Sequence, residues 1–366
     1  MGHIYFFTGF PGFISNQLIR ELIKRDEAVD KVYLLVLPEQ MGKAEAEIKT
    51  IESELDGAKV LFQLVIGDIT KENLNIAVPE SQSLQQEITH VFHLAAIYDL
   101  AVPEKIAQLV NVVGTKHVNE WVKGIPNLVR YTYFSTAYVA GNREGDLFEH
   151  ELVLPKSFKN HYERTKYDAE LLVEQLKSEV PTTIIRPGIV KGHSKTGETI
   201  KFDGPYFILN FLDRLSFLPM YPYISSERET VVNLVPVDYI IQSTAYLALY
   251  KEGVGKTYHL TDPSPCKATE IYELFVGELY KKKPKGHMPM AVSQAFLSIR
   301  PVRTYLGVEK EALDYFTWQG RFDCTKAQAD LAGSGIACPN FKDGVPAMVE
   351  FYLRNKNEKR YQIKIR

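Results

Sequence analysis

A tyrosine and a lysine four residues apart, Tyr162 and Lys166, are the side chains of this sequence best suited to proton-transfer chemistry. In a helix this spacing places both on one face, about one turn apart. A free tyrosine has a pKa near ~10 and exchanges its proton poorly at neutral pH. A lysine charge held nearby stabilises the phenolate and lowers that pKa. Because such a pair also arises by chance on a solvated helix, its meaning depends on the other segments of the chain.

Two hydroxyl side chains, Ser135 and Thr136, stand at the end of a predicted buried strand at residues 130–135. Hydroxyls at the carboxyl end of a central strand point into the crevice where ligands of such sheets bind. There they could polarise a substrate carbonyl while the phenol of Tyr162 handles the proton. Ser135 is equally suited to a capping role. Tyr138 ends the same segment and is a candidate substrate contact.

A glycine-rich turn, TGFPGFIS at residues 8–15, lies between a predicted strand and a helical pattern. Gly9 permits the tight turn, and Gly12 lets the backbone approach a pyrophosphate at the helix N-terminus. The third position of the motif, usually glycine, is Ser15, whose small side chain still allows close packing of the helix on the strand. The expected dinucleotide contacts in this turn are Thr8, Gly9, Gly12, Phe13 and Ile14.

Further strand ends supply the other cofactor contacts that we expect. Asp68 and Ile69 follow the third predicted strand, where the carboxylate could accept from an adenine amino group. A turn or N-cap role is the alternative for this aspartate. Ala95 and Ala96 follow the fourth strand and leave room for a dinucleotide to lie across the strand ends. His93, just before them, is expected to be a packed core histidine rather than a ligand.

The choice between NAD and NADP depends on the end of the second predicted strand. An acidic residue there would bind the ribose 2′-hydroxyl of NAD, and a nearby arginine would favour NADP. Leu37 stands at this place, Glu39 lies two residues on, and Lys43 could reach a 2′-phosphate. Both cofactors stay open, with a preference for NADP because no acid occupies the key position.

Predicted strands and helices alternate through the first half of the chain, which favours an α/β fold with a doubly wound parallel sheet covered on both faces. After about residue 195 the pattern changes to loop and then to mainly helical sequence. We therefore expect a dinucleotide-binding domain of residues 1–195 plus about 228–262, and a smaller substrate-binding lobe of about 196–227 and 263–366. The predicted strands are residues 3–7, 32–37, 60–65, 90–94, 130–135, 182–185 and 257–261, and the main helices are 14–24, 105–124 and 162–179.

The composition excludes several classes of protein. The 366 residues, 45% hydrophobic and 24% charged, are those of an ordinary soluble globular protein, and a net charge of -2 gives no sign of a nucleic-acid partner. Three cysteines without metal-ligand spacing predict reduced thiols, no metal site and a cytoplasmic location. The apolar N-terminus lacks the flanks of a targeting signal, and no stretch reaches the roughly 18 apolar residues of a membrane span.

Together these segments resemble the extended short-chain dehydrogenase/reductases, whose dinucleotide-binding domain has the Rossmann fold. The resemblance runs in order from the glycine turn through Thr136 and the Tyr162/Lys166 pair to two motifs, RPGIV at residues 186–190 and VPVD at residues 235–238. The hydroxyl residue of this family lies three positions before the valine of a Val-x-Gly sequence. In this chain the valine is Val139, followed by Ala140 and Gly141. The spacing therefore selects Thr136 rather than Ser135.

The resemblance implies a role for each matched residue. Tyr162 donates or accepts the proton, Lys166 lowers its pKa and bonds the nicotinamide ribose, and Thr136 binds the substrate oxygen. Asn111 braces the central helix on the cofactor side, and Asp238 ties the lobes together as a structural residue. The nicotinamide amide is expected to be lined by Pro187, Gly188, Ile189 and Val190.

Within that superfamily the motifs resemble the branch of thioester reductases and fatty acyl-CoA reductases, the male sterility type. The resemblance implies transfer of a hydride from NAD(P)H to an acyl thioester, bound to CoA or to a carrier, to give an aldehyde or an alcohol. The branch usually carries Arg after the second strand, and Leu37 departs from this. Residues 204–212, which include Tyr206 and Phe207, and their continuation into Leu215, Phe217, Leu218, Met220 and Tyr221 fit an apolar substrate wall or the packing face of the small lobe.

Two other enzyme classes use the same trio, the nucleotide-sugar epimerases or dehydratases and the hydroxysteroid-type alcohol dehydrogenases. A sugar nucleotide needs polar and basic groups in the small lobe, so the apolar stretch argues against the first class. A dinucleotide-sensing regulator without catalysis is a further alternative, against which the Tyr162/Lys166 pair counts. The basic tail of residues 354–366 could contact an anionic carrier or a membrane surface, although a solvated, frayed terminus is the simpler expectation. The oligomeric state is left open.

Overall fold

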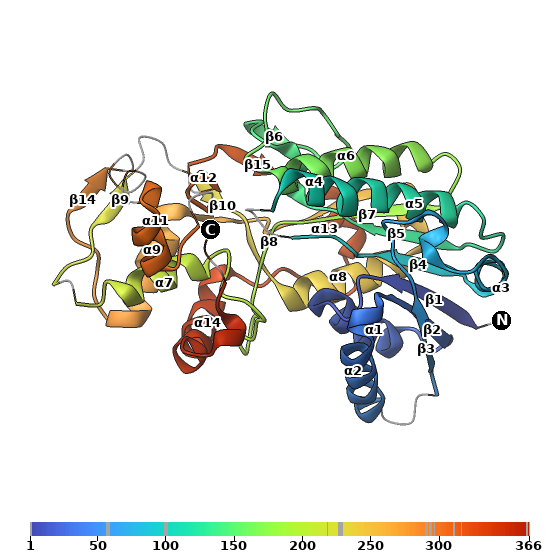
Figure 1. Cartoon of the computed structure of the whole chain (residues 1–366). Helices are drawn as coiled ribbons and strands as arrows, with labels where there is room; N and C mark the ends of the chain where they lie inside the picture. The colour runs from blue at the N-terminus through green and yellow to red at the C-terminus, as the bar shows by residue number, and fades with distance from the viewer. Residues whose placement is uncertain are drawn as a thin grey trace.

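A seven-stranded parallel sheet forms the centre of the computed structural model, in the order β12-β7-β5-β4-β1-β2-β3 (Figure 1). The chain builds β1, β2 and β3 outward and then returns to place β4 on the other side of β1. This is the strand order of a doubly wound sheet, so the predicted fold class is confirmed. The strands are β1 His3–Thr8, β2 Val29–Val36, β3 Leu61–Ile66, β4 His90–His93, β5 Arg130–Phe134, β7 Thr182–Pro187 and β12 Thr257–Leu260.

The structure describes most of the chain, and every structural statement below refers to the described part. The described residues are 2–55, 59–98, 102–217, 219–225, 230–289, 292, 295, 297–309, 312–315, 317–363 and 365. Leu218, part of the predicted substrate wall, lies outside them.

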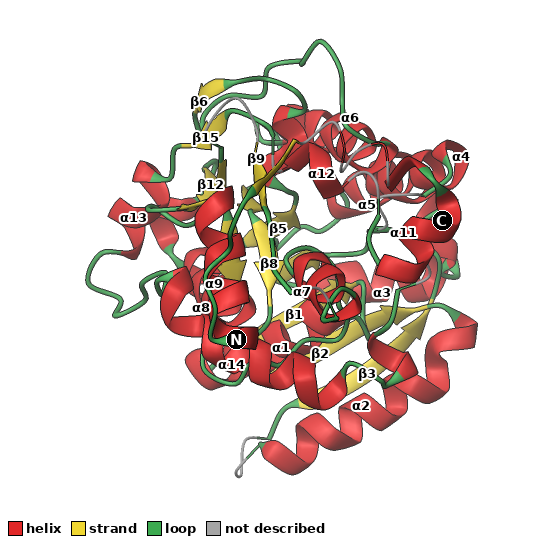
Figure 2. Ribbon diagram, turned by 90° about the vertical axis from the view of Figure 1, so that its left-hand side faces the viewer, coloured by secondary structure: helices red, strands yellow, loops and turns green. Residues whose placement is uncertain are grey.

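Helices cover both faces of the sheet, with α5 and α6 on one side and α1 and α2 on the other (Figures 1 and 2). A parallel sheet needs this double cover because its strands are apolar on both faces. The helices of the first layer are α3 Val78–Glu87, α5 Gly114–Val122 and α6 His161–Leu176. Those of the second layer are α1 Phe13–Arg25, α2 Met41–Glu54 and α8 Val237–Leu249.

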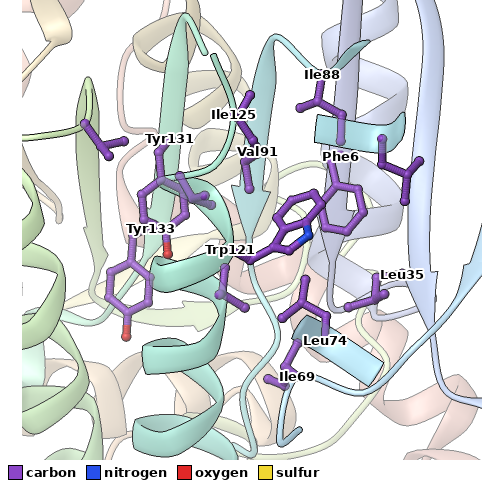
Figure 3. Close-up of a cluster of buried hydrophobic side chains, with 14 of the residues drawn as sticks. Phe6, Leu35, Ile69, Leu74, Ile88, Val91, Trp121, Ile125, Tyr131 and Tyr133 are labelled. Atoms are coloured by element: carbon purple, nitrogen blue, oxygen red, sulfur yellow. The ribbon is translucent and has the colours of Figure 1, made fainter. Parts of the chain in front are cut away.

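The central strand β1 shows how the sequence produces these two layers. Its side chains alternate, so Tyr5 and Phe7 pack in the cluster of α1, α2 and α8. Phe6 points the other way and meets Trp121 of α5, with 4.5 Å between ring centroids (Figure 3). Burial of such aromatic side chains stabilises the fold by roughly 1.5–3 kcal/mol each.

The helix predicted over residues 105–124 is interrupted. It consists of α4 (Glu104–Ala107), a π-helical segment (Gln108–Val113) and α5. A π segment bulges one extra residue into the helix and is frequent at functional sites. Here it contains Asn111, one of the predicted site residues.

The C-terminal lobe packs helices around its own hydrophobic core. Its helices are α7 Tyr206–Arg214, α9 Ala268–Tyr280, α11 Arg300–Leu306, α12 Ala312–Tyr315 and α14 Phe341–Asn355. Short strand pairs join the lobe to the sheet domain or extend it: β8 Ile189–Lys191 with β11 Leu234–Pro236, β10 Val231–Val232 with β13 Cys266–Lys267, β9 Tyr223–Ser225 with β14 His287–Pro289, and β6 Gly145–Leu147 with β15 Gly320–Phe322.

The division of the chain into two domains stays a prediction, with one observation that refines it. Helix α13 (Thr325–Leu331) packs Ala327 and Leu331 against Tyr258 and Leu260 of β12. This part of the last hundred residues therefore covers the main sheet instead of building the C-terminal lobe.

The predicted frayed tail is contradicted as far as residue 363. Tyr361 is 8% exposed, and its ring stacks on Phe202 with 5.2 Å between centroids. Lys356 forms an ion pair with Asp213 at 2.5 Å. Apolar partners in the core of the lobe hold the segment in place, which the basic composition of the tail does not reveal. In the described part of the chain no helix combines the length and the apolar character needed to cross a membrane.

Candidate active site

A cavity of about 240 Å³ lies where the strands β4, β5 and β7 end. This carboxyl edge is where ligands bind in doubly wound sheets. The sheet domain contributes the strand ends, the start of α1 and the first turns of α6, and the C-terminal lobe contributes the remainder. The described lining residues are Ile14, Leu94, Ala96, Tyr98, Phe134, Ser135, Thr136, Tyr138, Tyr162, Lys166, Pro187, Gly188, Ile189, Val190, Asp203, Gly204, Pro205, Phe207, Val232, Leu234 and Tyr315.

Helix α6 carries Tyr162 in its first turn, with the side chain lining the cavity. The helix begins there because the Asn160 side-chain oxygen accepts the N–H of Glu163 at 2.9 Å. The Tyr98 ring packs edge-on against the Tyr162 ring, with 5.1 Å between centroids. Burial, and then the charge of Glu163, raises the pKa of the Tyr162 phenol, while a hydrogen bond with Thr136 opposes this. The phenol therefore carries its proton at neutral pH and can donate it.

Lys166 lies one turn further along α6 and also lines the cavity. Its Nζ donates to the Tyr133 hydroxyl at 2.9 Å and to the Phe134 carbonyl at 2.7 Å, at the end of β5. Burial lowers the pKa of this ammonium to about 7. The expectation that Lys166 lowers the pKa of Tyr162 is thus not met, because the ammonium is bound to the strand end and burial dominates at the phenol.

The two hydroxyls after β5 have different surroundings. Thr136 accepts the N–H of Tyr138 at 3.2 Å, as the cap of a 3-10 turn (Ala137–Ala140), and its hydroxyl is hydrogen-bonded to the Tyr162 phenol at the cavity. Ser135 instead donates to Glu170, which Arg186 holds by a hydrogen bond from Nε at 2.8 Å. Of the two, Thr136 is the one whose hydroxyl can form a hydrogen bond with a ligand in the cavity.

The glycine turn fits a dinucleotide pyrophosphate. Gly9 has φ +89°, and a Cβ there would lie 2.7 Å from the backbone nitrogen of Ala95. A Cβ at Gly12 would lie 2.6 Å from the Gly9 carbonyl oxygen, so the turn itself requires both glycines. Among the described residues no side chain caps α1, and its first turn carries no acidic residue. The N–H groups of that turn, next to Phe13 and Ile14, are therefore free to bind an anion.

Thr8 holds the turn in place but does not line the cavity. Its hydroxyl is hydrogen-bonded to Nδ1 of His93 at 2.7 Å and accepts the N–H of Ala95 at 3.2 Å. His93 is buried with its pKa lowered to about 3 by desolvation, as expected of a core histidine. Ala96 lines the cavity beyond this cluster.

Asp68 forms a turn, one of the two alternatives that the sequence leaves open. Its Oδ1 accepts the N–H and the hydroxyl of Thr70, both at 2.8 Å. Ile69 packs into the core beneath α5, where its side chain meets Gly114. Both lie beside the site rather than in the cavity.

Asn111 joins three elements at the cofactor side. Its Oδ1 accepts the N–H of Ile97 at 2.9 Å, and its Nδ2 donates to Thr165 of α6 at 3.0 Å. The bracing role expected from the resemblance agrees with these contacts. Asp238 at the start of α8 accepts the N–H of Ser194 at 2.8 Å, a structural tie to the loop after β8.

The end of β2 carries no acidic side chain. Leu37 begins a 3-10 turn (Pro38–Gln40) and is exposed, as are Glu39 and Lys43. These positions do not decide between the two dinucleotides.

One wall of the cavity comes from β7 and β8, as expected: Pro187, Gly188, Ile189 and Val190. Tyr138 and Phe207 also line it, and their contact with substrate stays a prediction. Tyr206 does not, because it points to the opposite side of α7, into the core of the C-terminal lobe, where its hydroxyl donates to the Gly197 carbonyl at 3.2 Å.

Sequence reasoning missed several lining residues, among them Asp203 and Tyr315. Asp203 is the only carboxylate that the described residues place at the cavity, and burial raises its pKa to about 6. Tyr315 comes from α12 and donates its hydroxyl to Glu163 at 2.8 Å, across 152 positions of sequence. Neither position has a local pattern that marks it. In the described chain no group of three or more His, Cys, Asp or Glu side chains could hold a metal ion.

Comparison with known proteins identifies the family. A family model of NAD-binding domains described as "Male sterility protein" matches residues 7–244. Two curated relatives are similar to the chain. "Fatty acyl-CoA reductase wat" of Drosophila melanogaster is 29% identical over 219 residues, covering 50% of this chain and 42% of the relative. "Fatty acyl-CoA reductase 1" of Gallus gallus is 27% identical over 321 residues, covering 76% of this chain and 61% of the relative.

The chain thus spans about half the length of these relatives. A solved structure of similar size is the terminal R domain from the myxalamid PKS-NRPS biosynthetic pathway, with a TM-score of 0.81 and 25% identity over 98% of this chain and 92% of that domain. The glycine turn, the cavity at the strand ends and the matched family all indicate a nicotinamide dinucleotide as cofactor. With more than half of its length matched by the family model, the chain belongs to the male sterility protein family of extended short-chain dehydrogenase/reductases.

Proposed function

We propose that this protein reduces an acyl thioester, bound to CoA or to an acyl carrier, to an aldehyde or an alcohol with NAD(P)H. The observation that carries the proposal is one cavity that brings together Thr136, Tyr162 and Lys166 at the strand ends, where a nicotinamide would lie. The names of the curated relatives support the thioester as substrate class.

The three side chains divide the chemistry of reduction between them. When bound, the dinucleotide supplies a hydride to the carbonyl carbon. The Thr136 hydroxyl donates a hydrogen bond to the carbonyl oxygen, and Tyr162 gives its proton to that oxygen as negative charge develops. The carbon–sulfur bond then breaks to release the aldehyde: the hydroxyl proton returns to Tyr162, and the thiolate takes a proton from solvent. Lys166, fixed at the end of β5 by its bond to the Phe134 carbonyl, would bond the ribose of a bound nicotinamide nucleotide.

NADP is the preferred cofactor in this proposal. No acid stands at the end of β2 to bind a free 2′-hydroxyl, and Lys43 in the first turn of α2 can supply charge to a 2′-phosphate. The three cysteines Cys266, Cys324 and Cys338 are free thiols, which supports a cytoplasmic location.

An acyl chain fits the rest of the cavity wall. Ile189, Val190, Phe207, Val232 and Leu234 present apolar side chains to it. A sugar nucleotide would need basic groups there, and Lys166 is the only Lys or Arg that the described residues place at the cavity.

The first experiment combines nucleotide binding with turnover. We expect NADPH to raise the melting temperature more than NADH does, and acyl-CoA substrates to cause NADPH oxidation, read at 340 nm across a chain-length series. Tyr162→Phe should keep the nucleotide-induced shift and lose turnover by about a hundredfold or more, the usual contribution of a positioned acid. Stabilisation by neither nucleotide, or equal turnover in the variant, would refute the proposal.

A further inference from the structure

A buried carboxylate lies next in the chain to the proposed proton donor. Glu163 is 0% exposed, although it occupies the first turn of a helix that begins at the domain surface. Its Oε2 accepts the N–H of Lys159 at 3.0 Å, and its Oε1 lies 3.6 Å from the Nζ of the same lysine. An ion pair buried in this way rarely improves stability over apolar packing, because both charges lose their hydration. A role in function accounts better for its presence.

The third partner of Glu163 comes from the C-terminal lobe. The hydroxyl of Tyr315 donates to Glu163 Oε1 at 2.8 Å and accepts from Nδ2 of Asn160, the cap of α6, at 2.9 Å. The Tyr315 ring lines the cavity and packs edge-on against the Tyr138 ring, with 5.1 Å between centroids. One side chain of the C-terminal lobe therefore contacts both the substrate space and the turn that carries the proton donor.

Lys159 contacts both the turn after β5 and aromatic rings of the C-terminal part of the chain. Its Nζ donates to the Gly141 carbonyl at 2.6 Å and lies 4.2 Å from the centroid of Trp318 and 5.3 Å from that of Tyr315. Burial lowers its pKa, and the charge of Glu163 opposes this. The ion pair between Lys159 and Glu163 thus depends on segments that are distant in sequence and pack around it in the fold.

We propose that Glu163 and Tyr315 are positioning residues: through their hydrogen bond, the C-terminal lobe holds the first turn of α6, and with it Tyr162, in place against the bound substrate. This inference rests on the proposed role of Tyr162 as proton donor. It assigns a function in the reaction to a residue of the C-terminal lobe that supplies no atom to the chemistry.

The charged groups around Glu163 and Tyr315 determine the direction in which Glu163 shifts the pKa of Tyr162. Glu163 faces Lys159 from the preceding loop, Tyr315 from α12 and Tyr138 from the turn after β5. Further titratable groups that the described residues place nearby are Asp314, which acts on Lys159, and Tyr98, Tyr133 and Lys166, which lie around Tyr162. After burial, the negative charge of Glu163 is the next largest cause that raises the pKa of Tyr162. Removal of this charge therefore lowers that pKa.

Two variants separate the hydrogen bond from the charge. Tyr315→Phe keeps the ring in the cavity wall and removes the donor, so we expect kcat for thioester reduction to fall about tenfold, with KM nearly unchanged. Glu163→Gln keeps an acceptor for Tyr315 and removes the charge. We expect its kcat to fall less than that of Tyr315→Phe, because the hydrogen bond that holds the first turn of α6 is kept.

The matched control is Tyr352→Phe, which removes a hydroxyl bonded to Asn210 at 3.0 Å in the same lobe but away from the cavity. It should leave kcat and the pH profile as in the wild type. The melting temperature and its shift with NADPH report whether each variant folds and binds nucleotide. If Tyr315→Phe folds, binds NADPH and keeps its kcat, or if Glu163→Gln loses at least as much kcat as Tyr315→Phe, the inference is wrong. Failure of the proposed function shows differently, as wild-type protein without turnover or as full activity in Tyr162→Phe.

Discussion

At the scale of single residues, burial of a charged catalytic candidate lowers the stability of the fold, and the spacing in the sequence does not show this. Lys166 is 3% exposed, and burial lowers its pKa to about 7 from the value near ~10.4 of an unfolded chain. A lysine whose folded pKa lies below its unfolded pKa destabilises the fold while it is protonated. This cost is fully present below pH ~7 and disappears as the pH rises toward the unfolded pKa.

We therefore predict that Lys166→Met changes stability in a pH-dependent way. The variant loses two hydrogen bonds at every pH, those to Tyr133 and to the Phe134 carbonyl. It also loses the cost of the buried charge, about 1.4 kcal/mol for each unit by which the pKa is lowered. Its free energy of unfolding relative to the wild type should thus be most favourable near pH ~6 and decline toward pH ~10. Urea unfolding at about pH 6, 8 and 10 without bound nucleotide checks this, and a constant difference would contradict it.

The residues that sequence reasoning located are those with fixed local spacing. Tyr162 and Lys166 are one helical turn apart, and Thr136 follows a strand, so each is marked by its neighbours in the chain. Tyr315 reaches the site only through tertiary packing, and Ser135 lines the cavity with its hydroxyl already bonded to Glu170. Such contacts depend on distant segments and have no pattern in a single sequence.

At the scale of elements, the π segment Gln108–Val113 is a feature that the apolar periodicity of the sequence does not predict. The apolar pattern predicts one continuous helix, and a π turn has no distinct composition of its own. Its consequence is the placement of Asn111, whose amide bonds the backbone of Ile97 and the side chain of Thr165. The segment thereby links the end of β4, the cofactor side and the catalytic helix.

We predict that Asn111→Ala lowers both stability and nucleotide affinity. It leaves the Ile97 N–H without its partner, at a cost of about 1–3 kcal/mol. It also releases the chain after β4, so NADPH binding by calorimetry should weaken. Asn119→Ala is the control, because Asn119 on α5 accepts the Tyr131 hydroxyl at 2.9 Å in the core. This control should lose similar stability with unchanged affinity. Equal affinity losses in both variants would show that Asn111 acts through general destabilisation.

At the scale of the whole molecule, the strands and helices of the sheet domain were predictable one by one, whereas the C-terminal lobe was predictable only as a smaller, mainly helical unit. Alternating strands and helices of the first domain carry strong periodic patterns, and the observed strands agree closely with the predicted ones. The lobe consists of short helices and paired strand fragments held by aromatic contacts between distant segments, such as Phe202 with Tyr361. Its form depends on these contacts more than on local propensity, so its individual elements and its ordered tail were not foreseen.

The packing of Tyr361 also connects the tail to the active site. Phe202 receives the Tyr361 ring, its N–H donates to the Tyr361 carbonyl at 2.9 Å, and the next residue is Asp203 of the cavity wall. We predict that Tyr361→Ala lowers the free energy of unfolding by about 3 kcal/mol, as expected for loss of a buried ring. Because the wall at residues 203–205 loses its support, KM for the acyl thioester should rise while NADPH affinity stays unchanged.

Tyr361→Phe keeps the ring and the packing, so it should resemble the wild type in urea unfolding and in steady-state kinetics. A mobile tail would make both substitutions neutral. A loss of stability without a change in KM would show instead that the tail supports the lobe but not the cavity wall. The combined result, lower stability with a higher KM only in the alanine variant, is the outcome that the contact between Phe202 and Tyr361 requires.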